Sequence, residues 1–213
     1  MRKGRVSNNV IRRLPKYLRK LDQLSEQGVA RISSFELGEQ LGLTPSQIRQ
    51  DFSNFGEFGQ QGYGYSVASL RDQIASILGM NKGHNAIMVG VGRIGHALLD
   101  NFGFESYGVN IKCAFDIKPS LIGTEVNGVP VIDMDSLADY HKENTVDFAI
   151  LTVAKDAALS VGNILIENGV KAIWNLTNVE LTEPDSPVIV ENLHFSDSLL
   201  ALSYYIDEAE DEK

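Results

Sequence analysis

The first 80 residues carry apolar positions at helical spacing, and the longest such run lies between Ser7 and Gly28. Its apolar residues recur every three or four positions, the period of an amphipathic helix: Val10, Ile11, Leu14, Leu18, Leu21 and Leu24. Pro15 lacks the N–H that would bond back to Ile11, which predicts a bend or a restart of the helix. Gly28 is a natural C-terminal stop.

Two shorter helices are predicted next, each with a recognisable start. Ser33-Ser34-Phe35-Glu36 has the capping-box pattern, with Leu37 and Leu41 facing inward and Gly42 closing the helix. Thr44-Pro45-Ser46-Gln47 starts a second helix, roughly 45–55, in which Thr44 caps and Pro45 takes the first turn. This helix should bury Ile48, Phe52 and Phe55 and expose Ser46, Gln47, Arg49, Gln50 and Ser53.

The two short helices, joined by Gly42-Leu43, predict a helix-turn-helix. Gln can pair with adenine, and Arg with guanine or phosphate. The segment 58–65 (FGQQGYGY) alternates glycine with aromatic residues and predicts a β-hairpin that could enter a minor groove as a wing. The alternative is a helical interaction domain with a flexible glycine loop.

A short helix over 69–78 and a linker over 79–83 complete this part, and the pattern then changes to α/β. We therefore predict an N-terminal domain over 1–80 and a second domain over 81–213. Buried strands are expected at 85–89, 109–116, 146–152, 171–176 and 188–192, with helices after residue 95 and over 155–168. Strands alternating with helices predict a Rossmann-type parallel sheet.

The first of these strands is followed by G-x-G-x-x-G at Gly90, Gly92 and Gly95, in the strand-to-helix context that this motif requires. The first glycine permits a tight turn, the second lets backbone approach a pyrophosphate, and the third allows close helix packing. Asp116, at the end of the next strand, could bind the ribose hydroxyls and repel a 2′-phosphate. This favours NAD(H) over NADP(H), although Lys118 nearby weakens the preference. A glycine-rich turn that binds nothing is the alternative.

Further crevice residues are expected where the later strands end, at Thr152-Val153 and Asn175-Leu176. The last predicted helix runs over 197–209 with Ser196 as its cap. Its apolar residues cover too wide an arc for a surface helix: Leu199, Leu200, Leu202, Tyr205 and Ile206. It should bury against a second subunit or, alternatively, against its own domain.

Composition and charge fit a two-part chain of 213 residues with 43% hydrophobic residues and a net charge of −9. Residues 1–60 carry ten Lys/Arg against six Asp/Glu, whereas residues 61–213 carry nine against 22. All eight charges in the first twenty residues are positive, which suggests phosphate contact by a basic arm; a solvated charged helix is the alternative.

The same counts limit other functions. A single cysteine, Cys113, excludes an internal disulfide framework and a cysteine-cluster zinc site. No apolar run of ~18 residues predicts a membrane span, and the basic N-terminus has no signal-peptide core after it, so we expect a cytoplasmic location. The four histidines lack metal-ligand spacing, so no metal site is predicted, and none offers a clear proton donor for catalysis.

Over essentially its whole length, the chain resembles the Rex family of redox-sensing transcriptional repressors. The resemblance is carried by the segments 13–17 (RLPKY), 31–34 (RISS), 43–51 (LTPSQIRQD), 55–56, 59–65 (GQQGYGY), 90–95 (GVGRIG), 114–116 (AFD), 151–153 (LTV) and 191–192.

The resemblance implies a homodimer with an N-terminal winged helix, a Rossmann domain and a last helix swapped onto the partner. It implies repression at an inverted-repeat operator in double-stranded DNA and release by NADH, with no enzymatic activity. The DNA contacts expected here are Lys16, Ser33, Ser46, Gln47, Arg49, Gln50, Gln60, Gln61 and Tyr63. The residues expected around NAD(H) are Gly90, Val91, Gly92, Arg93, Ile94, Gly95, Asp116, Ile117, Lys118, Thr152, Val153, Asn175 and Phe195.

Two positions depart from the pattern. Many members have an acid before the position of Phe195 and a tyrosine six residues after the last loop glycine, which in those members join the switch with the arginine matching Arg19. This chain has His194 and Asn101 there. Two other functions stay open: a small NAD-dependent oxidoreductase with a helical appendage, and a DNA-binding regulator that senses a CoA-type nucleotide.

Overall fold

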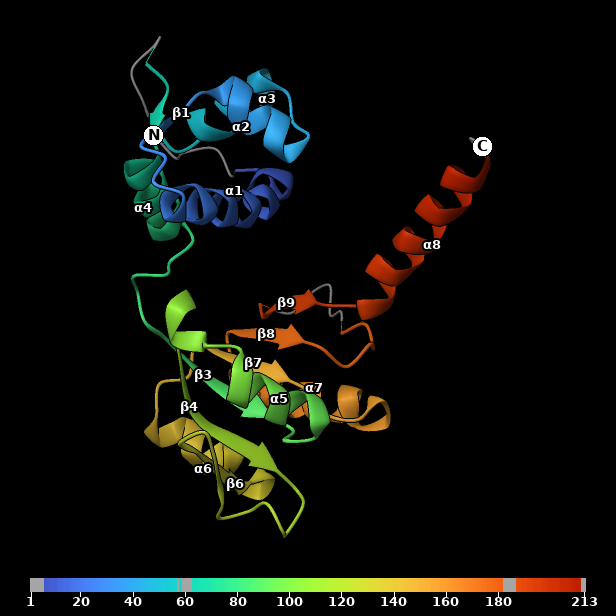
Figure 1. Ribbon diagram of the computed structural model, residues 1–213. Coiled ribbons are helices and arrows are strands. Elements are labelled where there is room, and N and C mark those ends of the chain that lie inside the picture. Colours follow the sequence, from blue (N-terminus) through green and yellow to red (C-terminus); the bar gives the residue numbers. More distant parts are fainter. Residues whose placement is uncertain (1–5, 57, 59–62, 182–186, 212–213) are drawn as a thin grey trace. The chain divides into compact units, whose positions relative to one another are not determined.

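The computed structural model describes residues 6–56, 58, 63–181 and 187–211 (Figure 1). The chain divides into two compact units, Met1–Lys82 and Gly83–Lys213, which we describe separately.

The N-terminal unit contains four helices and a two-stranded sheet within its described residues. They are α1 (Asn8–Glu26), β1 (Arg31–Ile32), α2 (Ser34–Leu41), α3 (Pro45–Ser53), β2 (Tyr65–Ser66) and α4 (Val67–Ile77). Of the bend or restart predicted at Pro15, the restart is wrong, because α1 is one helix with Pro15 inside it. The tight packing of α1 explains this, since its apolar stripe is buried on both sides of the proline.

The starts of α2 and α3 confirm the predicted caps. Ser33 Oγ accepts a hydrogen bond from the amide of Glu36, whose carboxylate accepts one from the amide of Ser33. Thr44 Oγ1 accepts from the amide of Gln47 at 3.2 Å. Gly42 ends α2 with a φ of 66°, a left-handed conformation that glycine adopts without strain.

The predicted hairpin over 58–65 has most of its residues outside the described part of the chain. Where the chain is described again, β2 pairs antiparallel with β1, Arg31 opposite Ser66 and Ile32 opposite Tyr65. The unit's core lies beside this small sheet. There Phe52 packs edge-on against Tyr17 and Tyr65, with ring centroids 5.1 and 5.2 Å apart.

The C-terminal unit is built on a seven-stranded sheet in the order β5-β6-β4-β3-β7-β8-β9. All neighbours are parallel except the β5–β6 pair. The strands are β3 (His84–Val89), β4 (Val109–Asp116), β5 (Glu125–Val126), β6 (Val129–Asp133), β7 (Phe148–Leu151), β8 (Ala172–Asn175) and β9 (Ile189–Asn192). The strand order reverses at β3, so a crevice is expected where β3 and β7 end side by side.

Each face of this sheet has its own hydrophobic core, because side chains alternate along a strand. Val89 and Phe115 face one core with Leu165 of a covering helix, and Met88 faces the other with Leu99. The helices are α5 (Arg93–Asn101), η1 (Phe104–Tyr107), η2 (Met134–Ser136), α6 (Leu137–Glu143), η3 (Lys155–Ala157), α7 (Ala158–Glu167) and α8 (Phe195–Asp211). The predicted 155–168 helix thus begins with a 3-10 turn.

The last helix differs from the prediction in two ways. It begins at Phe195, so Ser196 lies within its first turn and is not its cap. Its apolar side chains are 52–67% exposed: Leu199, Leu200, Leu202, Tyr204, Tyr205 and Ile206. Packing against its own unit, the alternative considered above, is therefore not found in the described part of the chain.

Candidate functional site

The glycine loop joins β3 to α5 and leaves the start of that helix open. Gly92 occupies the N-cap position and has no side chain that could accept a hydrogen bond from the first turn of α5. A Cβ on Gly92 would meet nothing within 4 Å. Free amide donors at a helix start, next to open space, suit the phosphates of a dinucleotide.

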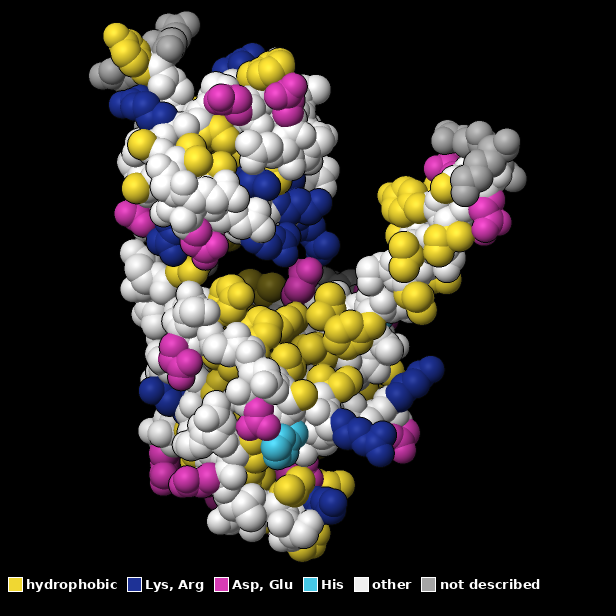
Figure 2. All heavy atoms as spheres, in the orientation of Figure 1, with side chains coloured by type: hydrophobic (Ala, Val, Ile, Leu, Met, Phe, Trp, Pro, Cys, Tyr) yellow, Lys and Arg dark blue, Asp and Glu magenta, His cyan; other side chains and the backbone are white. Residues whose placement is uncertain are grey.

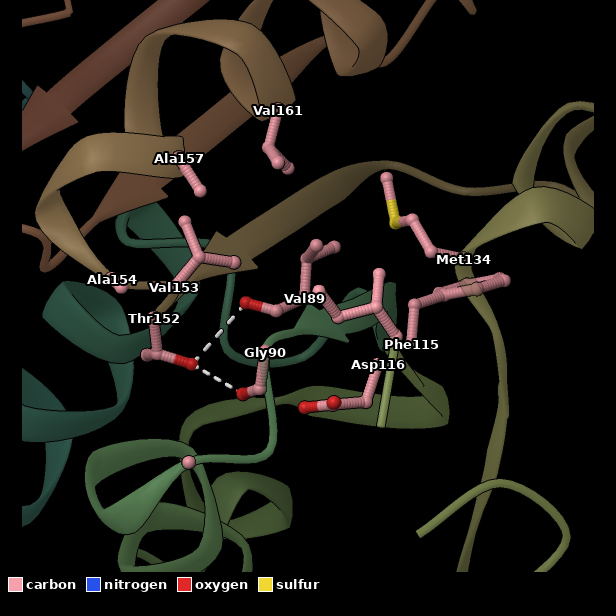
Figure 3. A pocket seen from close by; sticks show the side chains of 12 residues that line it. Val89, Gly90, Phe115, Asp116, Met134, Thr152, Val153, Ala154, Ala157 and Val161 are labelled. Carbon is pink, nitrogen blue, oxygen red and sulfur yellow. Dashed lines mark hydrogen bonds between the residues drawn. The ribbon is translucent and has the colours of Figure 1, made fainter. Parts of the chain in front are cut away.

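The other two loop glycines are fixed by close packing. A Cβ on Gly90 would lie 2.9 Å from the amide nitrogen of Val153, and one on Gly95 would lie 2.1 Å from the carbonyl oxygen of Gly90. Thr152 holds the same carbonyl, since its Oγ1 donates to it at 2.6 Å (Figure 3). Thr152 is buried, so within this structure its hydroxyl supports the loop.

Asp116 also supports the loop. Its Oδ2 accepts from the amide of Val91 at 2.7 Å, and its Oδ1 accepts from the amide of Lys118 at 2.8 Å. Each carboxylate oxygen can accept a second hydrogen bond, and Asp116 is only half-buried. It can therefore order the loop and still accept ribose hydroxyls.

These residues border a cavity of about 260 Å³ at the carboxyl ends of β3, β4 and β7. Apolar side chains surround it, with the carboxylate of Asp116 at one side (Figure 3). Sequence reasoning placed Gly90, Gly92, Asp116, Ile117, Thr152 and Val153 here but missed the apolar remainder: Val89, Phe115, Met134, Ala154, Ala157 and Val161. Ala157 and Val161 lie one helical turn apart, a spacing that could have indicated them.

The other predicted cofactor residues lie around this site at different depths. Arg93 and Ile94 are exposed on the first turn of α5, and Ile117 is 79% exposed. Phe195 is exposed at the start of α8. Asn175 is buried, and its amide donates to Val179 and Asn192, so its side chain serves the β8–β9 edge instead of the cavity.

The two positions that depart from the family pattern have local partners. Asn101 donates to the carbonyl of Ala97 on its own helix. His194 lies with Nε2 2.9 Å from a carboxylate oxygen of Glu180. Asn192 donates to the other oxygen of Glu180, so the chain just before α8 has a polar network of its own.

Most of the predicted DNA contacts that the structure describes are exposed side chains of the N-terminal unit. Ser46, Arg49 and Gln50 are exposed on α3, Gln47 is half-buried, and Lys16 is exposed on α1. Tyr63 is 72% exposed. Ser33 has its hydroxyl in the cap of α2, and Gln60 and Gln61 lie outside the described residues.

Two arginine contacts in this unit were not anticipated. Arg49 donates from Nη1 to Ser34 Oγ at 3.0 Å and from Nη2 to Ser46 Oγ at 3.3 Å. Arg13 forms a two-pronged ion pair with Asp51, at 2.6 Å from Nε and 2.7 Å from Nη2.

Asp51 is 2% exposed, and Tyr17 Oη also donates to it, at 2.7 Å. Burial, together with the bond to Asp51, raises the pKa of the Tyr17 hydroxyl far above its ordinary value. Arg13, part of the predicted basic arm, is thus used inside the fold.

The remaining reactive groups do not form a second centre. Burial raises the pKa of the Cys113 thiol to about 11, which leaves it protonated and unreactive at neutral pH. Across the residues that the structure describes, no three His, Cys, Asp or Glu side chains gather as metal ligands. Within those same ranges, none of the helices has the length and apolarity needed to span a bilayer.

Comparison with protein-family models matches the two parts of the chain separately. The model described as "Putative DNA-binding protein N-terminus" matches residues 5–53, and the model described as "CoA binding domain" matches residues 81–179.

Two whole-length relatives carry the same name. The chain is 47% identical to the "Redox-sensing transcriptional repressor Rex" of Clostridium botulinum (strain Hall) over 98% of this chain and 99% of the relative. It is 46% identical to the protein of that name from Thermoanaerobacter pseudethanolicus, over 98% and 93%.

Solved structures agree with these relatives. The structure of RSP, a Rex-family repressor, matches with a TM-score of 0.89 and 44% identity over 97% of this chain and 96% of that one. RSP in complex with NAD⁺ and operator DNA matches with a TM-score of 0.89 and 46% identity, over 97% and 95%. RSP in complex with NADH gives a TM-score of 0.89 and 43% identity, over 97% of both chains.

Proposed function

Since this chain belongs to the Rex family of redox-sensing transcriptional repressors, we propose that it represses transcription and senses the ratio of NADH to NAD⁺. It binds an inverted-repeat operator in double-stranded DNA and leaves it when NADH binds. One observation carries this proposal: a single chain joins a capped recognition helix with an exposed polar face to a glycine-loop pocket at a sheet switch point.

The N-terminal unit supplies the DNA contacts. α3 enters the major groove with Ser46, Gln47, Arg49 and Gln50, where Arg and Gln can read guanine and adenine edges. Lys16 and Ser33 contact phosphates, which adds affinity without sequence information. Tyr63, with Gln60 and Gln61, contacts the minor groove.

The C-terminal pocket fits a dinucleotide. Gly92 leaves open space at the uncapped start of α5, where the amides after Gly92 hold the pyrophosphate. Asp116 accepts the ribose hydroxyls and disfavours a 2′-phosphate. The other residues of this site are those predicted from the sequence: Gly90, Val91, Arg93, Ile94, Gly95, Ile117, Lys118, Thr152, Val153 and Phe195. Asn175, also predicted, supports the β8–β9 edge beside the site through its bonds to Val179 and Asn192.

The bound nicotinamide ring supplies a charge that differs between its oxidised and reduced forms. The apolar lining that includes Val153, together with Phe195 predicted from the sequence, penalises the cationic form, because a charge taken out of water without a partner is costly. The lining therefore binds the reduced form more tightly and favours the protein conformation that encloses it. In that conformation the two DNA units no longer match the half-site spacing.

The free energies required are modest. Moving a two-state equilibrium from 1:99 to 99:1 needs about 5.5 kcal/mol of differential binding. Two pockets in a dimer would each supply about half of that.

The dimer itself is part of the proposal. α8 presents apolar side chains that nothing in the described chain covers, visible along the helix in Figure 2. The C-terminal unit also exposes an aromatic cluster in which Phe102 lies 5.2 Å from Tyr107 and 5.7 Å from Trp174, measured between ring centroids. We propose that α8 packs on a second copy of the chain and buries both surfaces.

A regulator of this kind acts in the cytoplasm, where DNA and the NADH pool meet, and needs no catalytic turnover. The relatives are named as repressors, and no proton donor was predicted for an enzyme. Turnover assays with NADH and carbonyl substrates distinguish an oxidoreductase, and competition between NADH and acyl-CoA distinguishes a CoA sensor.

The test is replacement of Asp116 by alanine. We expect Asp116→Ala to bind an inverted-repeat duplex, selected from a randomised library by the wild-type chain, with unchanged affinity. NADH, added in the presence of excess NAD⁺, should no longer release it. Fluorescence anisotropy of the labelled duplex measures both quantities.

Asp139→Ala is the matched control, because Asp139 is an exposed carboxylate paired with Lys142 outside the pocket. It should respond to NADH as the wild type does. Release of Asp116→Ala at wild-type NADH concentrations would refute the ribose assignment. If NADH released no version of the chain, redox sensing itself would be wrong.

A further inference from the structure

The recognition helix carries an arginine that is held in place before any DNA arrives. Arg49 bridges two serines, Ser46 one turn earlier on α3 and Ser34 at the start of α2. The contact to Ser34 is therefore a link between the two helices of the helix-turn-helix, 15 residues apart in the chain.

The chemistry of the partners distinguishes this arginine from Arg13. Arg13 is neutralised by the buried carboxylate of Asp51, so its charge is used within the fold. Hydroxyl groups accept from Arg49 without cancelling its charge, and Arg49 stays exposed. Arg49 thus has a fixed direction and a full positive charge.

The neighbouring serine cannot do the same. Ser33 Oγ accepts from the amide of Glu36 at 3.1 Å as the cap of α2. Ser34, the first residue of the helix, does not cap it in the described contacts, and its hydroxyl oxygen accepts a hydrogen bond from Arg49. The two adjacent serines therefore have separate roles.

A guanidinium that is already held in place by hydrogen bonds is well suited to contact a base edge. A guanidinium has five N–H donors, so donors remain for the two acceptors of a guanine edge after two are used by the serines. Ordering a long side chain on binding costs about 0.5–1.5 kcal/mol, and here part of that ordering is complete in the free protein.

We propose that Ser34 is a positioning residue for sequence reading: its hydroxyl holds Arg49 in the direction that reads the operator base. This rests on the proposed function, since it assumes that α3 reads DNA. Ser34 sets sequence preference through Arg49 and contributes little to contact with the DNA backbone.

The experiment uses the full chain and four variants: Ser34→Ala, Ser34→Thr, Arg49→Ala and the double variant Ser34→Ala/Arg49→Ala. Each variant is used to select its preferred duplexes from a library randomised over the operator length. Its binding is then measured on the duplex that the wild type prefers and on a scrambled duplex. Ser69→Ala is the matched control, an exposed serine on α4 that accepts from Gln73 at 3.0 Å.

We expect Ser34→Ala to relax preference at the same base pairs as Arg49→Ala, to a smaller degree. Its affinity for the preferred duplex should fall about 3–10-fold, the size of one modest contact, and its affinity for the scrambled duplex should stay within about 2-fold. Ser34→Thr keeps a hydroxyl and should restore preference. Adding Ser34→Ala to Arg49→Ala should change nothing further.

Three outcomes would overturn the inference: unchanged preference in Ser34→Ala, equal loss on both duplexes, or an undiminished effect of Ser34→Ala when Arg49 is already alanine. The last two would show a direct or purely structural role. A wild-type chain that selects no sequence would instead contradict the proposed function, so the two failures are distinguishable.

Discussion

The two units of the chain differ in how far their helix starts are capped and their apolar side chains are covered. In the N-terminal unit, α1 buries its apolar stripe, and side chains cap α2, α3 and α4 through Ser33, Thr44 and Ser66. In the C-terminal unit, α5 starts without a cap, and α8 leaves its apolar side chains exposed. The helix-turn-helix thus satisfies the amides at its helix starts, whereas the C-terminal unit leaves the amides at the start of α5 and the apolar face of α8 uncovered.

This difference in capping and apolar exposure indicates where the chain has room for a ligand and a partner. Uncapped amides and uncovered apolar surface are unfavourable in water unless a ligand or a partner uses them. Both openings of the C-terminal unit have a proposed occupant: the dinucleotide at α5 and a second copy at α8. In the N-terminal unit, α1 also starts without a side-chain cap, but its apolar stripe is buried and both helices of the helix-turn-helix are capped by side chains.

The largest expected effect is on the free energy of unfolding, and it is tested by replacing one leucine in each unit. Leu21 on α1 is fully buried, whereas Leu200 on α8 is 67% exposed. Leu21→Ala should lower the free energy of unfolding of the N-terminal unit by about 2–5 kcal/mol, because it leaves a cavity in the core. Circular dichroism follows the helices of both units, and fluorescence of Trp174, the single tryptophan, follows the C-terminal unit.

Leu200→Ala is the matched variant. Within one chain it should cost less than about 0.5 kcal/mol, as other exposed substitutions do. Its effect should be found in sedimentation, as a dimer dissociation constant raised by at least about 10-fold, since a leucine buried at an interface contributes about 1.5–3 kcal/mol. Equal behaviour of the two variants in unfolding would contradict the contrast between the units.

What the sequence could predict follows from how local each interaction is. The capping box of Ser33 and Glu36 spans four residues, and the glycine motif spans six, so both could be predicted from the sequence. The pairs Arg13–Asp51 and Ser34–Arg49 join residues 38 and 15 apart, and no periodicity indicates such contacts.

Other features were missed for related reasons. Asp51 is a charged residue in a helix whose sequence is mostly polar, so the sequence does not indicate that it is buried. It is buried because α1 brings a guanidinium and a tyrosine hydroxyl to it. The strands β5 and β6 form a short antiparallel pair whose pattern is broken by Pro130, so it escaped notice. The apolar lining of the pocket comes from the ends of β3 and β4, the segment after β7, and the helices η2, η3 and α7, which only the fold brings together.

A second prediction concerns two glycines of the same loop. In Gly95→Ala the new Cβ would lie 2.1 Å from the Gly90 carbonyl oxygen, which is backbone and cannot move aside cheaply. We expect the C-terminal unit to lose about 1–3 kcal/mol of stability and the response to NADH to disappear. The Trp174 fluorescence transition in denaturant measures the first, and duplex release measures the second.

Gly92→Ala separates binding from folding. Its Cβ would meet nothing within 4 Å, so the Trp174 transition should stay within about 0.5 kcal/mol of the wild type. The methyl group would occupy space where backbone approaches the pyrophosphate, so NADH should bind more weakly. If Gly92→Ala bound NADH normally, the open start of α5 would not be the phosphate site.

The smallest expected effect is at the start of α3. Thr44→Ala removes the oxygen that accepts from the amide of Gln47, which should cost the N-terminal unit about 1 kcal/mol. Thr44→Ser keeps an acceptor at the same atom and should cost less. Both are measured by circular dichroism against an unchanged Trp174 transition, because the fluorescence reports only the other unit.

Alanine substitutions at the starts of α3 and α5 should therefore have different effects, one on stability and the other on NADH binding. Alanine at position 44 leaves an amide without its acceptor, so stability falls while NADH binding is unaffected. Alanine at position 92 removes no acceptor, since α5 has none in its N-cap residue, so stability is kept while ligand binding falls. Equal unfolding of Thr44→Ser and Thr44→Ala would mean that the hydroxyl does not cap α3, and the contrast between a closed and an open helix start would then rest on the glycine loop alone.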